Sequence, residues 1–234
     1  MAVYRIPENR IWFPRVEEAE PEGLVGVGGD LSPQRLLTAY ALGIFPWYSD
    51  EDGPILWWSP DPRSVLPLDA VHVPQRLRRV VRRRIFRCTL NHAFGAVIRS
   101  CAASPRPGQG GTWVGSAMIT AYERLHHLGY ALSVEAWREG KLAGGIYGVA
   151  LGRAFFGESM FYRAPDASKA ALVYLTDYLR GQGYVLFDCQ QDTPHMRRFG
   201  AVEIPRVEFI RRLGEALASR QSPSGTSGSC ASRS

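Results

Sequence analysis

Two polar side chains stand together where a predicted buried strand ends. Residues 184–189 are almost all apolar up to Asp188, and Gln190 follows two positions later. Successive side chains of a strand alternate between its faces, so these two point to the same side. A carboxylate in such surroundings needs a partner or takes part in proton-transfer chemistry. The alternative is structural, with Asp188 bonding a backbone turn and Gln190 facing water.

A second acidic residue lies near the end of another predicted strand. Glu158 follows the apolar or small residues Phe155, Phe156 and Gly157. A buried carboxylate at this place can hold a cationic group of a substrate. The alternative is an ion pair with one of the many arginines, and residue type alone leaves both interpretations open.

Tryptophans and arginines point to a nucleic-acid partner. Trp47 and Trp113 each lie in a loop bounded by Gly or Pro, where an indole ring can stack on a nucleobase. The predicted helix over 74–85 keeps an apolar stripe and is otherwise covered by arginine. Alternatively, the tryptophans fill a gap between two modules, which suits Trp57 and Trp58 better, and the arginines form a solvated face.

The composition is that of an ordinary globular protein, with 45% hydrophobic and 21% charged residues. There are 28 Lys or Arg against 22 Asp or Glu, a net charge of +6, and nearly all the positive charge is arginine. Arginine binds phosphate in bidentate fashion, although a GC-rich genome explains the same bias. No stretch approaches the roughly 20 apolar residues of a membrane span. A missing secretory signal and cysteines without a CxxC pair predict a cytoplasmic protein.

Hydrophobic periodicity predicts the elements that position these residues. In chain order they are a helix over 33–42, the arginine helix over 74–85, helices over 93–100 and 116–128, three antiparallel strands within 131–162, a helix over 167–180, the strand over 184–189, a short helix opened by Thr193 and Pro194, a strand over 202–204 and a helix over 207–218. This order predicts an α+β, N-acetyltransferase-like fold, in which the reaction occurs where neighbouring strands separate.

The chain divides into a small N-terminal domain over 1–63, a catalytic domain over 64–220 and a disordered Ser/Gly-rich tail over 221–234. The glycine-rich segment 144–148 lies within a predicted strand rather than at a strand-to-helix turn. The pyrophosphate-binding signature of N-acetyltransferases is missing as well, which argues against a coenzyme A donor.

Several short motifs together resemble leucyl/phenylalanyl-tRNA–protein transferases, over about residues 3–218. They are Gly-Gly-Asp-Leu-Ser at 28–32, Gly-Ile-Phe-Pro-Trp at 43–47, Trp-Trp-Ser-Pro-Asp-Pro-Arg at 57–63, Gly-Glu-Ser-Met-Phe at 157–161, Ala-Ser-Lys at 167–169 and Asp-Cys-Gln at 188–190. The resemblance implies a small N-terminal domain and a Fem-related, N-acetyltransferase-like domain. It also implies transfer of Leu or Phe, and weakly Met, from aminoacyl-tRNA to the N-terminal Arg or Lys of proteins, which marks them for N-end-rule degradation.

The resemblance assigns roles to particular residues. Trp47 and Trp113 would hold the 3′-terminal adenosine of the tRNA. The basic helix would hold the acceptor arm through Arg78, Arg79, Arg82, Arg83 and Arg84. Two positions depart from the family, because Leu132 replaces a frequent His and Ile146 a frequent Met, so the preference among Leu, Phe and Met stays open.

An aminoacyl ester is already activated, so its aminolysis needs no ATP, metal or other cofactor. The α-amine that attacks it has an ordinary pKa of about 7.7–8.0, and the main task is to hold amine and ester together. We expect Asp188 to polarise Gln190, which accepts a hydrogen bond from the amine, and Glu158 to hold the acceptor's Arg or Lys. The aminoacyl side chain is expected in an apolar pocket formed by Ile146, Phe155, Met160, Leu172, Leu175 and Phe187.

Two other functions fit parts of this pattern. One is an acetyl-CoA-dependent N-acetyltransferase, which the missing pyrophosphate loop disfavours. The other is a non-catalytic RNA-binding protein, which Glu158, Asp188 and Gln190 within matching motifs disfavour. The expected partners are Leu-tRNA, Phe-tRNA and proteins that begin with Arg or Lys, with no membrane partner, and the expected state is a monomer.

Overall fold

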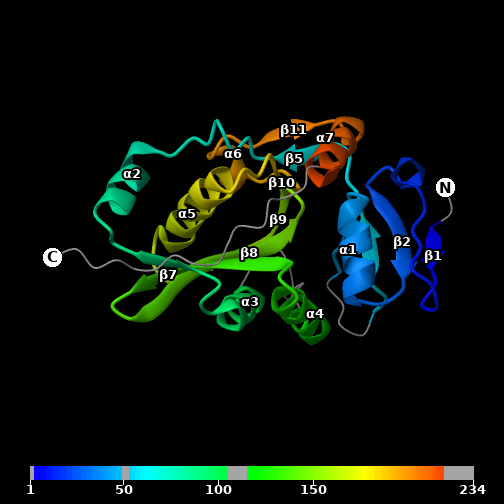
Figure 1. Ribbon diagram of the computed structural model, residues 1–234, viewed down its shortest axis with the longest axis horizontal. Coiled ribbons are helices and arrows are strands. Elements are labelled where there is room, and N and C mark those ends of the chain that lie inside the picture. Colours follow the sequence, from blue (N-terminus) through cyan, green and yellow to red (C-terminus); the bar gives the residue numbers. More distant parts are fainter. Residues whose placement is uncertain (1–2, 49–52, 105–114, 219–234) are drawn as a thin grey trace.

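The computed structural model describes residues 3–48, 53–104 and 115–218, and the predicted tail over 221–234 lies outside these ranges. Two β-sheets organise the described residues, a smaller one near the N-terminus and a larger one that carries most of the chain (Figure 1). The predicted α+β class with a small N-terminal module is confirmed. Among the described residues, none of the helices has the length and apolar character that crossing a bilayer requires.

The N-terminal sheet has the strand order β1-β2-β4-β3. Its strands are β1 (Tyr4–Ile6), β2 (Leu24–Gly28), β3 (Phe45–Pro46) and β4 (Leu56–Trp58). Helix α1 (Pro33–Ala41) begins with a proline directly after Ser32 and ends two residues before Gly43, whose φ of +75° terminates the helix. The predicted helix is therefore confirmed, and it buries Tyr40 near its C-terminal end.

The larger sheet has the strand order β11-β5-β10-β9-β8-β7-β6. Its strands are β5 (Arg63–Val65), β6 (Arg87–Leu90), β7 (Ala131–Arg138), β8 (Lys141–Leu151), β9 (Ala154–Tyr162), β10 (Leu186–Gln190) and β11 (Val202–Ile204). Strands β7, β8 and β9 form the predicted antiparallel meander, and β10 runs parallel to β9 after the chain has crossed over through a helix. The sheet therefore places the end of β10 beside the middle of β9, where Gln190 reaches Glu158.

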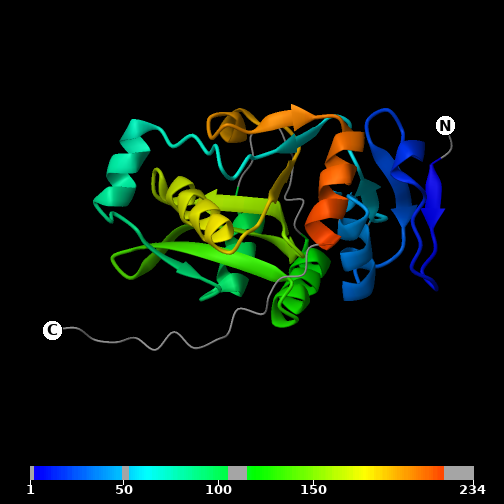
Figure 2. The same cartoon turned by 45° about the horizontal axis from the view of Figure 1, so that its top comes forward.

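Helices cover both faces of this sheet (Figures 1 and 2). They are α2 (Gln75–Arg82), α3 (Phe94–Ala102), α4 (Ser116–His127), α5 (Ala167–Gly181), α6 (Pro194–Arg197) and α7 (Arg206–Ala218). Helix α5 packs on β7, β8 and β9 from one side, and α3 packs on the same strands from the other. Helix α2 lies against α5 at the end of the molecule away from the N-terminal sheet.

The arginine helix is shorter than the sequence predicts. Helix α2 ends at Arg82, whereas the prediction extends to residue 85. Arg84 adopts a φ of +51°, which a helix does not accommodate. The strand predicted over 184–189 begins two residues later and ends one residue later, since β10 covers Leu186–Gln190.

The hydrophobic core has two parts, one on each side of the larger sheet. The part beneath α5 includes Ile146, Phe155 and Leu172. The other part joins residues of both sheets, such as Trp57 of β4 and Phe156 of β9, so the N-terminal sheet shares its core with the larger one. The chain passes from one sheet to the other between Trp58 of β4 and Arg63 of β5. The division into two domains after residue 63 stays a prediction.

Candidate active site

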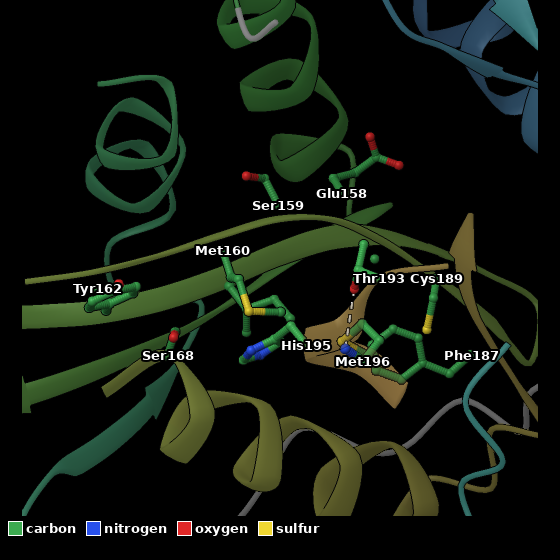
Figure 3. A pocket seen from close by; sticks show the side chains of 12 residues that line it. Glu158, Ser159, Met160, Tyr162, Ser168, Phe187, Cys189, Thr193, His195 and Met196 are labelled. Atoms are coloured by element: carbon green, nitrogen blue, oxygen red, sulfur yellow. Dashed lines mark hydrogen bonds between the residues drawn. The ribbon is translucent and has the colours of Figure 1, made fainter. Parts of the chain in front are cut away.

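A cavity opens where β9 and β10 stop pairing. The two strands pair over three positions, from Leu186 with Ala154 to Asp188 with Phe156. Beyond them Gln190 takes a left-handed backbone conformation with a φ of +64°, and the chain leaves the sheet. The cavity has a volume of about 360 Å³ (Figure 3). It is lined by Ile146, Gly157, Glu158, Ser159, Met160, Tyr162, Ser168, Phe187, Cys189, Thr193, His195 and Met196.

The Glu158 carboxylate collects hydrogen bonds from three elements beside this cavity. Its Oε1 accepts from the Tyr40 hydroxyl of α1 at 2.7 Å and from Gln190 Nε2 of β10 at 2.8 Å. Its Oε2 accepts from the Tyr122 hydroxyl of α4 at 3.1 Å. Figure 3 shows the carboxylate pointing away from Met160 and the rest of the apolar lining. Glu158 therefore joins the cavity to the packed interface with α1 and α4.

Burial raises the pKa of Glu158 to about 7, and the nearby charge of Asp188 acts in the same direction, while the donated hydrogen bonds act against it. The hydroxyl groups of Tyr40 and Tyr122 also contact each other. Two hydroxyl groups have two hydrogens for three contacts, so a proton on Glu158 completes the set. Burial, followed by the charge of Glu158, raises the pKa of both tyrosines well above 10, which keeps them as donors.

Asp188 is fully buried and pairs with a buried arginine. Arg63 donates from Nε to Oδ1 at 2.8 Å and from Nη2 to Oδ2 at 2.7 Å. The same Oδ1 accepts from the backbone N–H of Gln190 at 2.8 Å. The structure thus connects Asp188 to the backbone of Gln190, whereas we expected it to polarise the side chain, and that side chain instead donates to Glu158.

Besides Asp188, Arg63 contacts residues of the N-terminal module and of α7. Its Nη1 donates to the carbonyl of Gly43 at 3.1 Å. The guanidinium carbon lies 4.7 Å from the ring centre of Phe45 and 4.4 Å from that of Phe209 on α7, within cation–π distance of both. The ion pair with Asp188 therefore fixes the end of β10 to the N-terminal module and to α7.

The structure brings some of the predicted pocket residues to the cavity. Ile146, Met160 and Phe187 line it. Phe155, Leu172 and Leu175 are buried in the adjoining core beneath α5 and do not line it. Much of the lining that the sequence did not indicate comes from Cys189 of β10 and from the short segment after that strand, which supplies Thr193, His195 and Met196. Thr193 caps α6 in this segment.

The structure describes most of the residues that were predicted to contact the tRNA. Trp47 is half-buried, with its ring edge-on to Trp58 at a centroid distance of 5.9 Å, and Trp113 lies outside the described residues. Trp57 is fully buried and donates to the Gly28 carbonyl, in keeping with a packing role. The predicted arginines are all exposed on α2 or directly after it, namely Arg78, Arg79, Arg82, Arg83 and Arg84.

Tyr40, Tyr122 and Arg63 are site residues that the sequence analysis missed. Tyr40 and Tyr122 lie 118 and 36 positions from Glu158, and Arg63 lies 125 positions from Asp188. Arg63 closes one of the quoted motifs, Trp-Trp-Ser-Pro-Asp-Pro-Arg, which is the one signal that points to it. The tyrosines have no comparable signal, because they sit in ordinary amphipathic helices.

Comparisons with known proteins agree on a family. The family model described as leucyl/phenylalanyl-tRNA protein transferase matches residues 65–214, and the model of its N-terminal domain matches residues 29–61. The leucyl/phenylalanyl-tRNA–protein transferase of Nitratidesulfovibrio vulgaris strain DP4 is 60% identical over 216 residues, which are 92% of each chain. The protein of that name from Anaeromyxobacter sp. strain Fw109-5 is 58% identical and covers 93% of this chain and 92% of its own.

Among solved structures, the chain aligns with the ribosomal-protein-alanine N-acetyltransferase of Brucella melitensis biovar Abortus 2308. The two chains are 18% identical with a TM-score of 0.33, over 61% of this chain and 96% of that one. The family itself is shown by the sequence relatives and by the two family models. The chain belongs to the leucyl/phenylalanyl-tRNA–protein transferase family.

Proposed function

We propose that this chain transfers leucine or phenylalanine, and weakly methionine, from aminoacyl-tRNA to the N-terminal Arg or Lys of proteins. The product is a new peptide bond and an N-end-rule degradation signal. The observation that carries the proposal is the mainly apolar cavity between β9 and β10, which adjoins the Glu158–Gln190 hydrogen bond. Such a cavity suits a Leu or Phe side chain, and a carboxylate beside it suits a cationic acceptor. We place the reaction in the cytoplasm and expect the enzyme to act as a monomer.

Gln190 orients the attacking amine in this proposal. Its Nε2 donates to Glu158, which directs the amide oxygen away from that carboxylate and leaves it to accept a hydrogen bond from the amine. The backbone bond to Asp188 and the pairing of Asp188 with Arg63 hold the residue in place. The amine nitrogen attacks the ester carbonyl, the ester C–O bond breaks, and the proton that the amine loses ends on the ribose oxygen, which leaves as a hydroxyl group. Positioning is the main contribution because the ester is already activated.

Glu158 holds the cationic side chain of the acceptor. A carboxylate offers about four acceptor positions, and three are occupied by Tyr40, Gln190 and Tyr122. In this proposal the remaining position on Oε2 accepts from the guanidinium or ammonium group of the acceptor. A bound cation favours the ionised carboxylate, whereas the empty site favours the protonated one.

The cavity holds the aminoacyl side chain against Ile146, Met160 and Phe187. Its volume of about 360 Å³ is at the lower end of the about 300–1,000 Å³ usual for ligand pockets. Burial, then the charges of Lys169 and Arg198, lower the pKa of His195, so this residue of the lining is neutral at pH 7.

For the tRNA, we assign the terminal adenosine to Trp47 and Trp113 and the acceptor arm to the exposed arginines of α2.

Intact mass spectrometry tests the proposal. A reporter protein with N-terminal Arg is incubated with this protein and Leu-tRNA, without ATP, beside a reporter that begins with Gly. We expect a mass gain of one leucine on the Arg reporter alone. Turnover of acetyl-CoA without tRNA would instead identify an N-acetyltransferase, and tRNA binding without any transfer from Leu-, Phe- or Met-tRNA would identify a non-catalytic RNA-binding protein.

Acceptor binding is expected to release a proton near pH 6.5. At this pH most of Glu158 is protonated, because burial has raised its pKa to about 7, and a bound guanidinium lowers that pKa. Acceptor affinity should therefore rise as the pH increases through 7. Calorimetric titration with an N-terminal-Arg peptide, in buffers of different ionisation enthalpy, measures the released proton.

The control for this experiment is Glu158→Gln, which keeps the shape of the side chain but cannot titrate. Protons released by the peptide's own α-amine remain in the variant and can be subtracted. Equal proton release by the wild type and the variant would show that Glu158 does not meet the cation.

Enlarging a cavity side chain is expected to change the preference among aminoacyl groups. Ile146 lines the cavity, and the larger side chain of Ile146→Phe fills part of its volume, so the variant should reduce transfer of Phe more than transfer of Leu. A change of about one or two methylenes in such a pocket shifts a kcat/KM ratio by about 10- to 100-fold. Leu172→Met is the matched control, because Leu172 is buried in the same core but does not line the cavity. A larger change of ratio in the control would place the aminoacyl pocket elsewhere.

A further inference from the structure

A second cavity adjoins the first and lies between three elements. It has a volume of about 590 Å³ and is bounded by α2, by the end of β9 with the start of α5, and by α6 with the residues that follow it. Its lining consists of Pro74, Arg76, Leu77, Tyr162, Pro165, Asp166, Ser168, Lys169, His195, Arg198 and Phe199. Tyr162, Ser168 and His195 also line the first cavity, so the two cavities are adjacent.

The lining of this second cavity, hereafter the groove, is positively charged. Arg76, Lys169 and Arg198 contribute three cations, and Asp166 contributes one carboxylate. Asp166 bonds Lys169 at 2.7 Å and lies 3.9 Å from Arg76. Arg198 is exposed, and no ion pair of its side chain occurs within the described ranges. The excess of cations matches a polyanion better than a peptide.

An aromatic side chain stands where the two cavities meet. Tyr162 is the last residue of β9 and is 68% exposed, far more than a packing role requires. In Figure 3 it lies with Ser168 on the side of the first cavity away from Glu158. An exposed aromatic ring between cationic side chains is the arrangement that holds single-stranded nucleic acid, by stacking a base and pairing its phosphates.

The position of the groove identifies which part of an RNA fits it. One side of the groove adjoins the proposed aminoacyl pocket, and the other is bounded by α2, which carries exposed arginines assigned to the acceptor arm. We infer that the groove binds the single-stranded 3′ end of the donor tRNA, with a base stacked on Tyr162 and a phosphodiester held by Arg198, Arg76 and Lys169. This inference rests on the proposed function and extends it to the nucleotides that precede the terminal adenosine.

A series of donors of increasing length tests the inference. The donors are 3′-leucyl-adenosine, a leucylated CCA trinucleotide and Leu-tRNA, each used with the N-terminal-Arg reporter. For Arg198→Ala, which lies outside the first cavity, we expect kcat/KM to change less than about twofold with the adenosine donor and to fall about tenfold or more with the trinucleotide and the tRNA. For Tyr162→Ala, which lines both cavities, we expect the loss with the trinucleotide and the tRNA to exceed the loss with the adenosine donor by about tenfold, which is within the range for one lost base stack.

Two comparison variants separate the groove from the other surfaces. Arg82→Ala on α2 is expected to affect Leu-tRNA and to spare the trinucleotide, which is too short to reach the acceptor-arm surface. Arg124→Ala removes an exposed arginine from α4, on the opposite face of the sheet, and should affect none of the donors.

Unchanged kcat/KM with the trinucleotide in the groove variants would overturn the inference. Equal losses of kcat/KM with all three donors would also overturn it, because they would assign these residues to the aminoacyl pocket. A change in the KM of the acceptor alone would overturn it as well, because it would assign the groove to the acceptor protein. Failure of the wild type to transfer from any donor would contradict the proposed function instead. Fluorescence anisotropy with a labelled CCA trinucleotide would then test the groove independently of transfer. The inference predicts that the trinucleotide binds and that Tyr162→Ala weakens this binding about tenfold.

Discussion

Replacement of Asp188 by alanine is expected to lower the free energy of unfolding by about 3–5 kcal/mol. The substitution leaves the guanidinium of Arg63 fully buried between two phenylalanine rings, without its counter-ion. It also removes the acceptor of the Gln190 backbone N–H, so the end of β10 is no longer fixed. Transfer by the folded fraction should fall by about 100-fold, which a displacement of about 1 Å is enough to cause. Urea denaturation and a kcat/KM measurement check the two effects.

The double variant Arg63→Met with Asp188→Leu separates stability from positioning. Apolar replacement of a whole buried ion pair is often neutral or stabilising, so we expect the unfolding free energy to recover towards that of the wild type. Transfer should stay low, because Gln190 and the Gly43 carbonyl both lose their partners. A fully stable Asp188→Ala variant, or a double variant with wild-type transfer, would contradict the role assigned to the pair.

Replacement of Glu158 by glutamine is expected to lower kcat/KM for acceptors with N-terminal Arg or Lys by about 10- to 100-fold. The substitution removes the charge that meets the acceptor cation, and a hydrogen bond to a charged group is worth about 1.5–3 kcal/mol. Peptides that begin with citrulline, which has the shape of arginine without its charge, show whether charge is what matters. The wild type should prefer Arg over citrulline, and the variant should lose this preference.

Tyr40→Phe and Tyr122→Phe are the controls for this charge effect. Each removes one hydrogen bond from the same carboxylate and leaves its charge in place. We expect a smaller loss in each and an unchanged preference for Arg over citrulline. If Glu158→Gln retains that preference, the acceptor cation is bound by another group.

Local features of the fold follow from local sequence, and the structure bears this out in particular elements. The alternation in 131–162 predicted the β7-β8-β9 meander, and the proline after Ser32 and the Gly43 stop predicted α1. Strand β5 has only three residues next to prolines, so it has no periodicity to detect. The arginine run kept its pattern past Arg82, although the backbone turns at Arg84.

The site could be predicted only in part, because its contacts are distant in sequence. The motifs pointed to Glu158, Asp188 and Gln190, but they did not show which hydrogen bonds and ion pairs these residues form. The parallel pairing of β10 with β9 brings Gln190 next to Glu158, and that pairing depends on the crossover through α5. Isolated sequence cannot distinguish a catalytic carboxylate from the counter-ion of a buried arginine. In the structure Asp188 pairs with buried Arg63 and accepts a hydrogen bond from the backbone N–H of Gln190, and its part in catalysis stays a prediction.

The central claim is that the cavity between β9 and β10 receives the aminoacyl group. The sequence has four methionines, and Met160 and Met196 line this cavity, whereas Met118 is buried on α4 in the other part of the core. A titration of protein labelled with ¹³C at its methionine methyl groups, using a non-hydrolysable amide analogue of 3′-phenylalanyl-adenosine, tests the claim directly. We expect the Met160 and Met196 signals to shift much more than that of Met118. Saturable binding that leaves Met160 and Met196 unmoved would contradict the claim.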